Sequence, residues 1–162
     1  MLWLLALLVL GTAPVVHPDG RIAQFRIDRT TEAEVRAALG KPARVEAIVN
    51  DVTQRRVGRA FTYRCGRSCS TIYSISAATG KLSDFETESP QFRTERGSHP
   101  GMSAARAARL EGKRLVPGCG DGLYVHVHWD RHHAFVLTAS HGRIDGITYL
   151  GQHSVFYEGS AS

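Results

Sequence analysis

Histidines are concentrated in one short segment near the C-terminal end of this 162-residue chain, at positions 126, 128, 132 and 133. His126 and His128 stand two apart in an alternating run, so a strand would project both imidazoles from one face, about 6.6 Å apart along it. Imidazoles at that spacing can ligate one zinc or copper ion. The segment therefore raises the hypothesis of a metal site on His126, His128 and either His132 or His133, with His132 taken as the third ligand.

The same alternation supports a second interpretation. Leu123, Val125, Val127 and Trp129 would form the apolar side of the strand. Tyr124, His126 and His128 would then face solvent or a partner. The segment also differs from the His-x-His-x-Asp-His motif of metallo-hydrolases, because Arg131 separates Asp130 from His132. We favour a solvent- or partner-facing surface, and keep a metal or pH-sensitive site and an enzyme as alternatives.

Three cysteines are present, and two of them flank a three-residue turn between predicted strands. Cys65 and Cys69 would face each other across that hairpin, so we predict a disulfide between them. Cys119 is left with several roles: it could pair with either of the others, stay buried, or link two chains. The sequence contains no combination of nucleophile, base and acid and no phosphate-binding glycine loop, so we expect a non-catalytic protein without a cofactor.

The first residues indicate export. Residues 2 to 10 are uncharged and apolar, and this run is too short for a membrane span, which takes about 20 residues. We predict a signal peptide over residues 1–18, with small residues at Gly11-Thr12-Ala13 near a cleavage site. The mature protein would be secreted, or would lie in the periplasm or cell envelope. Contact with a membrane would come only through an uncleaved signal segment.

The charge distribution argues against a nucleic-acid partner. The formal net charge is +5, and both halves of the chain share the excess. A nucleic-acid binder usually concentrates its cations on one face. One of the two basic clusters includes Arg106 and Arg109, which would share one side of a helix. With Tyr124, His126 and His128, these arginines are the candidate interface for another extracellular or envelope protein.

Two helices and several strands should position these residues. Thr31 and Glu34 have capping-box spacing before an apolar stripe, and Gly40 with Pro42 ends the helix. Ser103 begins a similar pattern that ends at Gly112. Alternating segments then predict strands at 61–64, 70–75, 82–86, 123–129, 134–138 and 144–149. A further strand is possible at 45–49, and a last one could begin at Gln152.

Matching positions suggest an internal repeat. Thr31, Gly40 and Lys41 correspond to Ser103, Gly112 and Lys113 in the second half. We therefore predict an α+β protein of two tandem units, residues 21–89 and 92–158. Each unit would be a short helix followed by a three- or four-stranded antiparallel meander. Units of this size are marginal alone, so the two should share contacts.

The capped helix that ends in Leu39-Gly40-Lys41-Pro42, repeated more weakly over residues 101–113, resembles a known pattern. It is similar to the secreted β-lactamase-inhibitor-protein fold and to the related small outer-membrane assembly lipoproteins. Members of that group act by binding other proteins, often through an exposed sheet face. This chain lacks the lipid-attachment cysteine of the lipoproteins and no inhibitory contact residue can be matched, so the resemblance implies only the architecture and a binding role.

Overall fold

Most of the regular structure is β-sheet. The computed structural model describes residues 13–118 and 122–156. Its two helices are α1 (Glu32–Leu39) and α2 (Ala104–Glu111). The strands in chain order are β1 (Val15–Val16), β2 (Arg21–Ile22), β3 (Phe25–Arg26), β4 (Arg44–Val49), β5 (Arg56–Gly66), β6 (Cys69–Ser76), β7 (Leu82–Thr87), β8 (Arg93–Thr94), β9 (Leu115–Pro117), β10 (Leu123–Trp129), β11 (Ala134–Ser140) and β12 (Arg143–Leu150).

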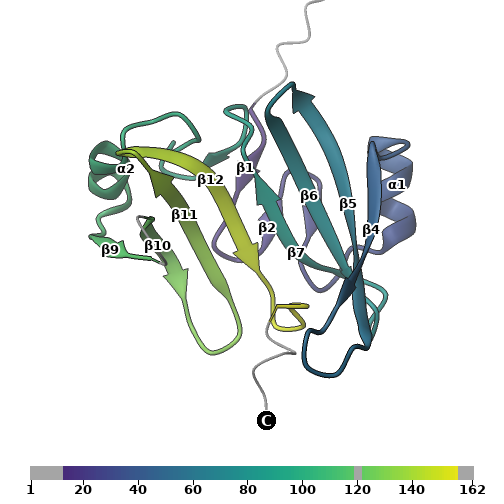
Figure 1. The fold of residues 1–162 in the computed structure, drawn as a ribbon. Coiled ribbons are helices and arrows are strands. Elements are labelled where there is room, and N and C mark those ends of the chain that lie inside the picture. Colours follow the sequence, from purple (N-terminus) through teal and green to yellow (C-terminus); the bar gives the residue numbers. More distant parts are fainter. Residues whose placement is uncertain (1–12, 119–121, 157–162) are drawn as a thin grey trace, which may run out of the picture.

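One eight-stranded sheet dominates the fold, in the order β4-β5-β6-β7-β12-β11-β10-β9 (Figure 1). All its neighbouring strands are antiparallel. Strands from the two halves of the chain meet where β7 pairs with β12, from Thr87 opposite Ile147 to Asp84 opposite Leu150. Side chains that alternate along these strands therefore share two common faces across both halves.

A second, four-stranded sheet has the order β3-β2-β1-β8. Its strand β1 pairs with β2 in antiparallel fashion and with β8 in parallel. Val16 and Ile22 in this sheet are fully buried. Strand β1 lies inside the predicted signal peptide of residues 1–18, and both the leader and its boundary stay predictions.

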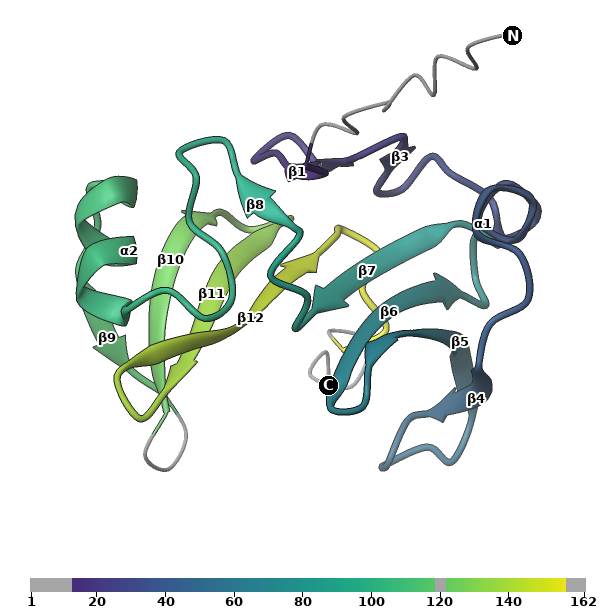
Figure 2. The ribbon, with the colours of Figure 1, turned by 90° about the horizontal axis from the view of Figure 1, so that it is seen from above.

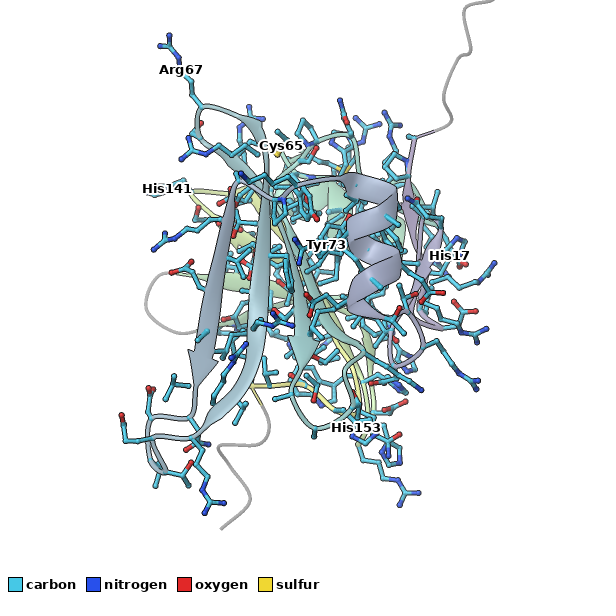
Figure 3. All side chains as sticks on the ribbon, turned by 90° about the vertical axis from the view of Figure 1, so that its right-hand side faces the viewer. His17, Cys65, Arg67, Tyr73, His141 and His153 are labelled. Atoms are coloured by element: carbon cyan, nitrogen blue, oxygen red, sulfur yellow. A yellow bond between two sulfur atoms is a disulfide. The ribbon has the colours of Figure 1, made fainter. Side chains whose placement is uncertain are left out.

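The face of the large sheet that we call the inner face is buried in the core. A row of directly opposed aromatic residues crosses it from β5 to β11: Phe61, Tyr73, Phe85, Tyr149 and Phe135. All five are at most 3% exposed. Figure 2 shows that the helices and the four-stranded sheet lie along one side of the curved eight-stranded sheet. Val35 of α1 and Ala107 of α2 belong to the same core cluster as the aromatic row, and Figure 3 shows Tyr73 beside α1.

Local chemistry explains both helices. The Thr31 hydroxyl accepts from the Glu34 backbone N–H, and the Glu34 carboxylate accepts from the Thr31 N–H at 2.7 Å, as the capping box predicts. Arg59 of β5 forms an ion pair with Glu32, which fastens α1 to the sheet. Ser103 caps α2, which ends at Gly112 in the left-handed conformation. In the described part of the chain, no helix is long and apolar enough to cross a membrane.

The predicted fold class is wrong. The protein is mostly β, with sheets of four and eight strands, and not an α+β pair of helix-plus-meander units. The internal repeat is likewise not supported. Two features were missing from the prediction: the pairing of β7 with β12, which merges the strands into one sheet, and the small sheet built from residues 15–26 and 93–94. The segment from Gln152 to Phe156 forms turns and no strand. The residue boundaries 21–89 and 92–158 stay a prediction.

Candidate functional site

The outer face of the eight-stranded sheet, opposite the buried aromatic row, carries the candidate site. Two rows of directly opposed residues define this outer face. The first row runs through Ala60, Ser74, Asp84, Leu150, Ala134 and Trp129, and the second through Thr62, Ile72, Glu86, Thr148, Val136 and His126. The described helices and the small sheet pack on the other side, whereas the C-terminal segment lies on the outer face and buries its centre, where the Val155 N–H donates to Asp84.

A bulge in β10 decides which histidine belongs to this face. Opposite β11, His126 faces Val136 but His128 faces Phe135, so the register shifts between the two histidines. Because a bulge places two residues opposite one, the alternation changes phase after His126. His128 consequently stands opposite an inner-face residue, and Trp129 moves to the outer face. The predicted common face for His126 and His128, and the predicted apolar side for Trp129, are both wrong.

The bulge creates an aromatic row along β10. The imidazole of His126 stacks on the indole of Trp129, with ring centroids 4.9 Å apart and an interplanar angle of 19°. On the other side of His126, the Tyr124 ring lies 6.2 Å away. Trp129 is 57% exposed, so its indole is available for contact with a partner. Tyr124, His126 and Trp129 together form the aromatic row.

The remaining histidines belong to a hairpin turn organised by Asp130. Its Oδ1 accepts from the backbone N–H groups of His132 and His133, both at 2.7 Å. The His128 Nε2 lies 2.9 Å from its Oδ2. Donation from the His132 backbone, the His128 side chain and the His133 backbone holds the pKa of Asp130 well below its usual range. Asp130 therefore has a structural role in closing the turn between β10 and β11.

The structure does not assemble the hypothesised metal site. His126 is engaged with Trp129, His128 with Asp130, and the His132 Nε2 accepts from Arg131 at 2.9 Å. Within residues 13–118 and 122–156, no group of three His, Cys, Asp or Glu side chains could hold a metal ion. The metal hypothesis on His126, His128 and His132 thus gains no support from the geometry.

The arginines of the candidate interface lie apart from the aromatic row. Arg106 and Arg109 are exposed on α2, whose alanines pack into the core on the inner side of the sheet. Helix α2 and the aromatic row therefore lie on opposite faces of the large sheet, and the predicted interface itself stays a prediction.

The predicted disulfide is present. Cys65 and Cys69 are bonded at the tip of the β5–β6 hairpin, with Cα atoms 5.1 Å apart. Arg67 projects outward from the same tip (Figure 3). The disulfide is compatible with an oxidising compartment such as the extracellular space. Cys119 lies outside the described residues.

Sequence reasoning missed the acidic and apolar centre of the outer face. Asp84 is 2% exposed, and burial raises its pKa to about 6, while Ser83, Ser154 and the Val155 N–H act in the opposite direction. The pKa of Glu86 is also raised, by burial and then by the nearby carboxylates of Glu88 and Asp145. The alternation over residues 82–86 was the available signal, since it placed Asp84 and Glu86 on one side of a strand.

Comparisons with known proteins found one structure with a similar fold and no matching protein family. No protein-family model matches the chain, and no curated protein matches it. A crystal structure of an extracellular protein containing a SCP domain, from Bacillus anthracis str. Ames, is similar with a TM-score of 0.51 and 11% sequence identity. The match covers 76% of this chain and 43% of that one, so this chain spans less than half of the larger protein. At this identity the likeness concerns the fold alone.

Proposed function

We propose that the protein is an exported, non-catalytic binding module that recognises another extracellular or cell-envelope protein through the outer face of its eight-stranded sheet. The single observation that carries this proposal is the aromatic row on β10, in which Trp129 is exposed beside the half-buried Tyr124 and His126, on a face that no described helix or strand covers. Tyrosine and tryptophan are enriched in protein interfaces and dominate their binding energy.

Two further features support this function. The aromatic row is held by a regular strand pair and a bulge, so its geometry is set before any partner arrives. Phe156, 58% exposed, adds a second large apolar side chain to the same face, where it lines a cavity with Leu150 and Ile72. The disulfide and the apolar leader are compatible with a working site outside the cytoplasm.

The test compares two positions for a photo-crosslinking amino acid. Benzoylphenylalanine replaces His126 on the outer face, or Arg106 on α2 as the matched control. Crosslinks to one reproducible partner from the native extracellular fraction are expected at position 126 and not at 106. With the identified partner in hand, Trp129→Ser should weaken binding about tenfold or more. Equal crosslinking at both positions, or unchanged affinity in Trp129→Ser, would contradict the proposal.

A further inference from the structure

A small cavity opens on the outer face beside the C-terminal segment. Its volume is about 130 Å³, and its apolar walls come from Ile48, Ile72, Leu150 and Phe156. Asp84 and Glu86 supply its charged groups. Ligand pockets for whole small molecules commonly measure about 300–1,000 Å³, so this cavity suits a single side chain.

Asp84 provides a carboxylate oxygen that lacks a donor. Its Oδ2 accepts from the Ser83 hydroxyl at 2.8 Å and from the Val155 N–H at 3.1 Å. Its Oδ1 is buried and receives no hydrogen bond of normal geometry from the described residues, although the Ser154 hydroxyl lies close enough to the carboxylate to lower its pKa. A buried acceptor without a donor costs free energy, which a ligand that supplies a donor would recover.

The charge around the cavity is negative. The charged groups that shift the pKa values of Asp84 and Glu86 are Asp28, Glu88 and Asp145, and each of them raises the value by repulsion. Arg44, at the far edge of this face, is paired with Glu46 at 2.7 Å. A cation that entered the cavity would therefore meet uncompensated carboxylates.

We propose that this cavity binds a lysine side chain of the partner protein, with the methylenes against the apolar walls and the ammonium group on Asp84 and Glu86. The proposal rests on the proposed function, since it names the partner group that the same face would receive. Lysine fits better than arginine because only one oxygen of Asp84 is free, whereas the guanidinium fork is suited to two parallel acceptors.

The test uses the full chain and a probe that carries only the recognised group. Nα-acetyl-L-lysine N-methylamide is titrated at pH 7.5 while the amide signals of Ile72 and Val155 are followed by NMR. Saturable shifts with a Kd of the order of millimolar are expected. The matched norleucine probe, which has the chain without the charge, should give no saturable shift. No response to the lysine probe, or an equal response to both probes, would overturn the proposal.

Variants test whether the lysine probe binds in this cavity. Asp84→Asn should weaken the lysine probe at least tenfold, whereas Asp51→Asn, in an exposed loop, should leave it unchanged. If Asp84→Asn does not fold, Ala60→Leu fills the cavity from the sheet and should abolish the shifts. Unchanged binding in the folded variants would contradict the assignment. The two proposals can fail separately. Partner capture that is lost in Trp129→Ser while the lysine probe still binds concerns the proposed function. Lost probe binding with intact partner capture concerns this cavity alone.

The response should also depend on pH. Binding should weaken as the pH falls through about 6, because Asp84 then takes up a proton and loses its charge. The charged groups that act on Asp84 and Glu86 are Glu88 after β7, Asp145 on β12 and Asp28 in the loop after β3, and the C-terminal segment also carries the exposed His153. A His153→Gln variant should keep the pH dependence of probe binding. Loss of that dependence in the variant would show that His153, and not Asp84, is the titrating group.

Discussion

The carboxyl group of Asp84 is almost completely buried, although it must ionise at neutral pH. Its pKa lies at about 6 in the folded protein, against an ordinary value of 3.8. Between these values the folded state holds a proton that the unfolded chain has released, so the unfolding free energy decreases as the pH rises. Relative to the unmodified protein, Asp84→Asn should therefore gain up to about 3 kcal/mol of stability between pH 4 and pH 7.

Urea denaturation followed by Trp129 fluorescence measures this difference at each pH. Asp51→Asn serves as the exposed control and should follow the unmodified protein across the range. A stability difference for Asp84→Asn that stays constant from pH 4 to pH 7 would show that Asp84 does not titrate in this window.

At the scale of single residues, the sequence indicated side-chain direction only while the strand stayed regular. The positions of Tyr124 and His126 on one face followed from alternation, but His128 and Trp129 did not, because a bulge has no strong signature in residue type. The burial of Asp84 was equally hidden. It depends on Val155, which folds back beside a strand 71 positions earlier in the chain.

At the scale of elements, the two helix caps provide a comparison within one molecule. Thr31→Ala removes a hydroxyl that takes part in a complete capping box, and Ser103→Ala removes one that only accepts from Arg106. Each should lower the unfolding free energy by about 1 kcal/mol, with the larger loss for Thr31. Chemical denaturation of the two variants in parallel measures this order, and equal stability of Thr31→Ala and the unmodified protein would contradict it.

The disulfide acts on the β5–β6 hairpin more than on the whole fold. Its ring is short, with a sequence separation of 4, so in the chain-entropy model it contributes about 2 kcal/mol. Replacement of Cys65 and Cys69 together by serine should lower the unfolding free energy by no more than this amount. Amide exchange should accelerate at Arg64 and Ser70 first. A loss several times larger would mean that the bond supports the core.

Helix caps and turn residues were predictable because they depend on contacts within a few positions. Thr31 with Glu34, and Cys65 with Cys69, are such local pairs. The short strands β1, β2, β3 and β8 were not predictable, since two-residue strands carry no period. Their pairing is fixed by tertiary contacts alone.

At the scale of the whole molecule, the continuous sheet predicts a single unfolding transition. Phe61→Leu, in β5, disturbs the buried aromatic row far from Trp129 in β10. It should lower the unfolding midpoint by the same amount in Trp129 fluorescence and in far-ultraviolet circular dichroism. Ala78→Ser, at an exposed turn, is the control. Two separated transitions would instead show halves that unfold independently.

The sequence did not predict that the strands of both halves of the chain form one continuous sheet. The strand segments of the large sheet other than β9 were identifiable, but nothing in residues 82–87 or 143–150 specified that these two strands pair with each other. Sheet order is decided by packing between distant segments, and a meander offers several edges of similar composition. The number of strands and the sheet they share therefore required the structure.

The parallel pairing of β1 with β8 has a kinetic consequence. β8 lies within the segment that connects β7 to α2, and its pairing with β1 ties this segment to the beginning of the described chain. This pairing restrains the connection between the two halves of the chain, and we expect it to limit motion of the two ends of the large sheet relative to each other. A partner would meet a rigid template, so complex formation should proceed in one concerted step without a slow rearrangement after encounter.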